Sequence, residues 1–100
     1  MVKPHYHPDR VLRELASVLS RMDEKEVNDV FQALLTPRER ANIALRWKLV
    51  CMLEKGVTQR AIATRLGISL CKITRGSHEL KFGPTAFRKA IRQAVAKKEK

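Results

Sequence analysis

The chain has 100 residues and a mass of 11.5 kDa, with 44% hydrophobic and 31% charged residues. This length fits one domain, and the composition is typical of a soluble globular protein, not of a disordered one. No apolar stretch approaches the roughly 20 residues that a membrane span requires, and the N-terminal residues lack the apolar core of a secretory signal. We therefore expect no membrane partner and a cytoplasmic location.

The net charge of +11 is unevenly distributed. Residues 1–36 carry five lysines and arginines against six acids, whereas residues 37–100 carry sixteen against four. A basic segment of this size indicates a polyanionic partner, and nucleic acid is the first candidate ahead of a membrane surface. The few aromatic residues do not cluster, which favours duplex DNA over single strands.

The first third of the chain predicts two helices. Apolar residues recur at three- and four-residue steps over residues 9–22, which indicates a helix with one apolar face and Asp9 as its cap. The same spacing over residues 23–34 predicts a second helix, with acidic residues at its N-terminal end.

A long third helix is predicted over residues 37–55. Thr36 is the expected N-cap, Pro37 takes the first helical position, and Glu39 completes a capping box. No residue breaks the helix before Gly56, and its apolar residues wrap more than one face. We therefore expect this helix, including Trp47, to lie in a core or an interface.

Residues 59–75, QRAIATRLGISLCKITR, have the spacing of a helix-turn-helix. Gly67 supplies the left-handed turn, and Ala63 is small where the two helices approach most closely. Thr58 and Ser69 are the expected N-caps of the two helices. The apolar residues fall where the helices must pack together: Ile62, Leu66, Ile68 and Ile73. The alternative is a plain helical hairpin whose glycine is only a C-cap.

The second helix of this motif runs to about residue 80, and a last helix begins at Thr85. The predicted fold class is therefore all-α, with about six helices. We expect a flexible N-terminal tail over residues 1–8 and a single helical domain over residues 9–97, with the helix-turn-helix over about 58–81.

The sequence predicts no metal site and no catalytic site. His5 and His7 form an isolated pair in the tail, and Cys51 and Cys71 have no ligand spacing, so both cysteines are expected as reduced, buried or half-buried apolar residues. No nucleophile lies at a recognisable spacing from a base, so we expect neither an enzyme nor a cofactor.

The helix-turn-helix directs the N-terminal residues of its second helix into a major groove. Arg60 and Lys81 are expected at phosphates, and Lys72 at a base edge. The full set of predicted DNA-binding residues is Thr58, Gln59, Arg60, Ser69, Leu70, Cys71, Lys72, Thr74, Ser77, His78 and Lys81. His78 is included only because of the family resemblance given next, and plain solvent exposure is its alternative.

Several motifs resemble the tryptophan operon repressor family of bacteria over roughly residues 30–90. They are LTP at 35–37, ER at 39–40, TQR at 58–60, ITRGS at 73–77 and LK at 80–81. The resemblance implies an intertwined homodimer of six-helix subunits that represses transcription at a palindromic operator. It also implies L-tryptophan as the co-repressor, bound between each DNA-reading head and the core.

The resemblance also implies a ligand site. Arg46 and Arg75 would sandwich the indole, and Arg75 would also bind the carboxylate. Glu79 and Lys72 stand where the family usually has a serine and a threonine. The implied ligand residues are Arg46, Arg75, Gly76 and Glu79, together with Ala33, Leu35 and Thr36 of the other subunit.

Two alternative functions remain. The first is a regulator of the same fold that does not respond to tryptophan. The second is a basic helical protein that coats nucleic acid without sequence preference. A large ratio between operator and random-DNA affinity separates a repressor from a coating protein.

Overall fold

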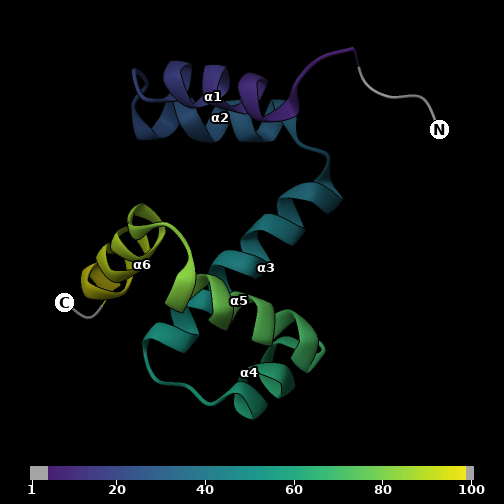
Figure 1. Cartoon of the computed structure of the whole chain (residues 1–100), viewed down its shortest axis with the longest axis vertical. Coiled ribbons are helices and arrows are strands. Elements are labelled where there is room, and N and C mark those ends of the chain that lie inside the picture. Colours follow the sequence, from purple (N-terminus) through teal and green to yellow (C-terminus); the bar gives the residue numbers. More distant parts are fainter. Residues whose placement is uncertain (1–4, 99–100) are drawn as a thin grey trace. The chain divides into compact units, whose positions relative to one another are not determined.

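A computed structural model describes residues 5–98, which form six α-helices and no strand (Figure 1). The expected all-α class is confirmed. Residues 1–4 of the expected tail lie outside the described residues. The helices are α1 (Pro8–Leu19), α2 (Glu24–Leu34), α3 (Pro37–Glu54), α4 (Gln59–Leu66), α5 (Leu70–Phe82) and α6 (Thr85–Lys98). No helix in the described part of the chain is long and apolar enough to cross a membrane.

The start of α1 differs from the expectation that Asp9 caps it. His7 is the N-cap and Pro8 takes the first helical position, because proline has no N–H to leave unsatisfied there and its φ suits a helix. Asp9 lies instead in the first turn, where a carboxylate interacts favourably with the helix dipole. The helix ends at Leu19, three residues earlier than the apolar spacing predicts.

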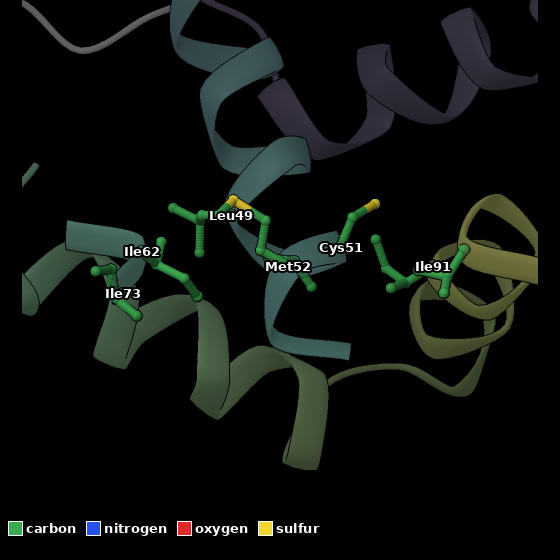
Figure 2. Close-up of a cluster of buried hydrophobic side chains, with 8 residues drawn as sticks. Leu49, Cys51, Met52, Ile62, Ile73 and Ile91 are labelled. Carbon is green, nitrogen blue, oxygen red and sulfur yellow. The ribbon is translucent and has the colours of Figure 1, made fainter. Parts of the chain in front are cut away.

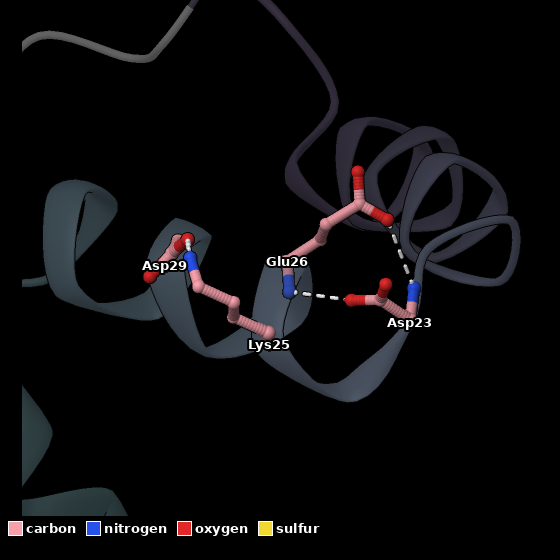
Figure 3. Close-up of polar contacts among 4 residues, drawn as sticks. All are labelled: Asp23, Lys25, Glu26 and Asp29. Carbon is pink, nitrogen blue, oxygen red and sulfur yellow. Dashed lines mark hydrogen bonds and ion pairs between the residues drawn. The ribbon is translucent and has the colours of Figure 1, made fainter.

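Capping boxes begin both α2 and α3. The N–H of Thr36 donates to Glu39 Oε1 at 2.8 Å, and the N–H of Glu39 donates to Thr36 Oγ1 at 3.2 Å. This confirms the predicted start of α3. The corresponding bonds between Asp23 and Glu26, at 3.1 and 2.9 Å, fix the start of α2 (Figure 3).

The chain divides into two compact units, one ending at Arg40 and the other beginning at Ala41. In the first unit, no residue of α1 or α2 is buried. The guanidinium of Arg40 donates to the carbonyls of Gln32 and Leu35 at 3.1 and 2.7 Å, which ties the first turn of α3 to the end of α2. The exposed large apolar side chains of α1 and α2 are Val11, Leu12, Val18, Phe31 and Leu34.

The second unit has a core built by α3, α4, α5 and α6. Figure 2 shows the α3 side chains between Ile62 and Ile73 on one side and Ile91 on the other. These three isoleucines are 0% exposed, and α5 packs against both α4 and α6 (Figure 1). The buried set is Leu49, Val50, Cys51, Met52, Ile62, Ile73, Ile91 and Val95.

The helix-turn-helix expectation agrees with this core. Ile62 and Ile73 are buried, and Leu66 and Ile68 pack against them half-buried. Gly67 has φ 64°, the left-handed conformation that ends α4 and that disfavours a residue with a Cβ.

The two predicted caps of the motif differ in outcome. The Thr58 hydroxyl accepts from the N–H of Ala61 at 3.2 Å, so this cap is confirmed. Ser69 holds the N-cap position of α5, but its side chain makes no capping hydrogen bond. The predicted side-chain cap at Ser69 is therefore wrong, although the helix begins where the sequence indicates.

Replacing Ile62 by alanine tests the core of the second unit. Because Ile62 is fully buried among α3 and α5 side chains, Ile62→Ala lowers the free energy of unfolding by about 2–5 kcal/mol. Leu70→Ala is the control, since Leu70 is 52% exposed, and its effect stays near about 0.5 kcal/mol. Urea unfolding followed by circular dichroism measures both, and equal losses would contradict this core.

The cap at Glu39 predicts a pH dependence. Hydrogen bonds from the backbone and side chain of Thr36 lower the pKa of Glu39 below 4.5. Ionised Glu39 therefore stabilises the fold above pH 4.5, and this contribution is lost as the pH falls below that value. Thermal unfolding of wild type and Glu39→Gln between pH 7 and pH 3 should show their difference shrinking in acid. Glu14→Gln is the exposed control, and a difference independent of pH would refute the cap's role.

Candidate ligand pocket and DNA-binding surface

A hollow of about 550 Å³ lies between α3 and α5 within the second unit. This volume is in the range of small-molecule sites. The α5 residues that line it follow a helical i, i+3, i+4, i+7 stripe, and Phe87 contributes from α6. The lining residues include Asn42, Leu45, Arg46, Trp47, Leu49 and Val50 of α3, and Lys72, Arg75, Gly76 and Glu79 of α5.

At Gly76, α5 lies directly against core side chains of α3. A Cβ at this position would lie 2.5 Å from Leu49 Cδ1 and 3.3 Å from Val50 Cγ2. No real side chain fits at that distance unless Leu49 moves, and Leu49 is 2% exposed within the core. The glycine of the ITRGS motif therefore sets the helix spacing that leaves the hollow beside it.

The lining of the hollow combines an apolar surface with separate charges. Leucine and valine side chains of α3, Trp47 and Phe87 supply the apolar part. The charged part is three cations against one carboxylate, namely Arg46, Lys72, Arg75 and Glu79. All four are exposed, and the one ion pair of residues 5–98 joins Lys25 and Asp29 at 2.9 Å (Figure 3).

This chemistry fits a flat aromatic ligand that carries a carboxylate. A guanidinium can stack on an aromatic face and can also bind a carboxylate with two parallel hydrogen bonds. A carboxylate such as that of Glu79 can pair with an ammonium group. The described part of the chain holds no cluster of residues suited to a metal ion.

The structure brings together four of the residues expected at the ligand. Arg46, Arg75, Gly76 and Glu79 all line the hollow. Ala33, Leu35 and Thr36 belong to the first unit and are not among the lining residues. The carbonyl of Leu35 already accepts from Arg40, which leaves one lone pair for any further donor.

Sequence reasoning missed several lining residues. Trp47, expected in a core or an interface, is 41% exposed and lines the hollow, so within this chain it is not a core residue. Lys72 was expected at DNA, at a position where the family usually has a threonine that lines the pocket, and the structure places it in the lining. Because α3 is apolar on nearly every side, its periodicity does not separate core positions from lining positions. Phe87 shows the spacing of a packed helix face, but only the tertiary structure places it at the hollow.

The expected DNA-binding residues lie almost entirely at the surface of α4 and α5. All are exposed except Ser77, which is half-buried. The His78 ring lies against Phe82, with centroids 5.0 Å apart. Cys51 is buried, but Cys71 is exposed. The expectation of a buried or half-buried Cys71 is therefore wrong, because position 71 lies in the open first turn of α5.

A shallower depression on α4 adds a further basic residue to this surface. It is lined by Thr58, Arg60, Ala61, Thr64 and Arg65. Two guanidinium groups and the Thr58 hydroxyl are suitable donors for phosphate oxygens, whereas the Thr64 hydroxyl already donates to the carbonyl of Arg60 at 3.1 Å. Arg65 is absent from the predicted set of DNA-binding residues. Its position in the last turn of the first motif helix, near Arg60, could have indicated it.

These observations describe an all-α protein with a helix-turn-helix beside a hollow of small-molecule size. The sequence profile of the family described as Trp repressor protein matches residues 11–95. The chain therefore belongs to the Trp repressor family, whose members are regulators. This confirms the resemblance on which the ligand expectations rest. No solved structure matches the chain significantly.

Several curated relatives are named Trp operon repressor homolog. One from Chlamydia trachomatis serovar L2 is 36% identical over 73 residues, covering 72% of this chain and 78% of the relative. One from Vibrio atlanticus is 34% identical over 80 residues, covering 79% and 80%. One from Pasteurella multocida is 36% identical over 73 residues, covering 72% of each chain.

Proposed function

We propose that this protein is a dimeric repressor that binds a palindromic DNA operator sequence-specifically, with L-tryptophan as its co-repressor in the cytoplasm. The observation that carries the proposal is the shared use of α5. One face of this helix lines the hollow, and its N-terminal turn exposes residues suited to a major groove. A ligand and DNA that bind the same helix raise each other's affinity when both favour one orientation of that helix.

The charge distribution supports the DNA half of the proposal. Sixteen of the 21 lysines and arginines lie in residues 37–100, and every predicted basic DNA contact on α4 and α5 is exposed. Phosphate contacts supply affinity, whereas exposed side chains at the start of the second motif helix read base edges. We infer duplex DNA as the partner from this combination.

The lining of the hollow supports the ligand half. Arg75 and Arg46 offer guanidinium groups to an indole and a carboxylate, and Glu79 offers a carboxylate to an ammonium. L-Tryptophan contains all three groups. Bound between α3 and α5, it would favour one orientation of the helix-turn-helix, so DNA affinity would rise with its concentration.

Selection of duplexes from a random pool tests this function. The proposal predicts that a palindromic sequence is enriched in the presence of L-tryptophan. It should bind at least about 10³-fold more tightly than random DNA at the same salt concentration. Enrichment of a sequence without any effect of tryptophan would favour a regulator of the same fold that does not respond to tryptophan. Failure to enrich any sequence would favour a protein that coats nucleic acid.

The exposed apolar residues of the first unit predict a dimer. α1 and α2 bury no residue within the chain, and a second subunit is the proposed cover. Sedimentation velocity at micromolar concentration should show a species of twice 11.5 kDa. Leu12→Lys should shift it toward monomer, whereas Leu70→Lys, at a similarly exposed residue of the second unit, should not. A wild-type monomer at these concentrations contradicts the dimer.

The ligand response should depend on the arginines of the hollow. Arg75→Ala removes the carboxylate partner and one indole face, so L-tryptophan should no longer raise DNA affinity. Arg46→Ala loses stacking alone, on the order of 1–2 kcal/mol. Fluorescence anisotropy of a labelled selected duplex, with and without tryptophan, measures both. Arg65→Ala, outside the hollow, is the control, and an undiminished response in Arg75→Ala rules out this site.

A further inference from the structure

Lys72 belongs to two surfaces of the second unit, the first turn of α5 and the lining of the hollow. It is the third residue of α5, directly after the exposed Leu70 and Cys71. It also lines the hollow on the same helix face as Arg75, Gly76 and Glu79, because these residues follow a helical i, i+3, i+4, i+7 spacing. No other predicted DNA-binding residue lines the hollow.

The surroundings of Lys72 allow its side chain two positions. Its ammonium makes no ion pair in the described part of the chain. Lysine has a flexible four-carbon stem that covers apolar surface while its head stays in water. Trp47 and Leu45 offer such a surface when the hollow holds no ligand, and an indole ring also attracts an ammonium.

A ligand in the hollow changes this balance. A flat aromatic ring covers the apolar lining that the stem of Lys72 would otherwise use. Arg46 and Arg75 line the same space and repel an ammonium. The ammonium group of the ligand also competes with Lys72 for Glu79, the one carboxylate of the lining. The position left for the Lys72 head is the outer side of the first turn of α5, beside the residues expected at DNA.

We propose that Lys72 is a ligand-dependent DNA contact: its ammonium is available to DNA when an aromatic ligand fills the hollow and is drawn over the hollow when it is empty. This inference rests on the proposed function, and it specifies one mechanism that couples ligand binding to DNA binding. Linkage requires that DNA in turn tightens ligand binding through the same residue.

The test compares how much L-tryptophan raises the DNA affinity of wild type and of Lys72→Gln. Anisotropy titrations of a selected duplex give this factor as a ratio of Kd values. In Lys72→Gln the factor should fall about fivefold, the worth of one charged contact of about 1 kcal/mol. Lys72→Arg should keep most of it. Arg60→Gln, an exposed α4 residue outside the hollow, should weaken DNA binding by equal factors with and without ligand.

Results that contradict the role of Lys72 differ from results that contradict the proposed function. If Lys72→Gln weakens DNA binding equally with and without tryptophan, or leaves it unchanged, Lys72 is not a ligand-dependent contact. Calorimetry without DNA provides a second readout, in which Lys72→Gln should bind tryptophan within about twofold of wild type. Loss of that binding would make Lys72 a simple ligand contact and overturn the coupling. A wild type that ignores tryptophan contradicts the proposed function itself, and this inference with it.

Discussion

The close approach of α5 to α3 at Gly76 is the constraint on which the rest of the second unit depends. The missing side chain lets α5 reach Leu49 and Val50, two residues of the buried core. Ile73 lies in the same core, and Lys72, Arg75 and Glu79 of the same helix line the hollow. The missing Cβ at Gly76 thus allows the spacing between α5 and α3 beside the hollow.

The two units bury apolar surface to different extents. The second unit encloses three isoleucines completely, whereas α1 and α2 leave Leu12, Phe31 and other apolar residues exposed. A chain of this length buries only a modest fraction of its surface when it folds alone. Oligomerisation is a common way to cover the apolar faces that remain exposed. The first unit therefore carries the surface on which the proposed dimer depends, and the second carries the surfaces proposed for DNA and ligand. The excess of basic residues lies in residues 37–100, which include the whole second unit.

Much of the fold could be predicted from the sequence because local signals fix the helix ends. The Thr36 capping box and the left-handed Gly67 act within a few residues. The site could be predicted only in part. Family motifs identified Arg46 and Arg75, but the roles of Trp47 and Phe87 depend on how three helices pack, and the periodicity of an apolar helix does not report this. Lys72 was assigned to a base edge because it lies at the N-terminal end of the second motif helix, and only the packing of α5 beside α3 shows that it also lines the hollow.

The central claim is that the hollow between α3 and α5 holds an aromatic amino acid. Calorimetric titration of L-tryptophan into the purified protein tests it most directly. The account predicts saturable binding of one molecule per chain, lost in Arg75→Ala and retained in Arg65→Ala. Wild-type protein that shows no saturable heat at millimolar tryptophan would contradict it.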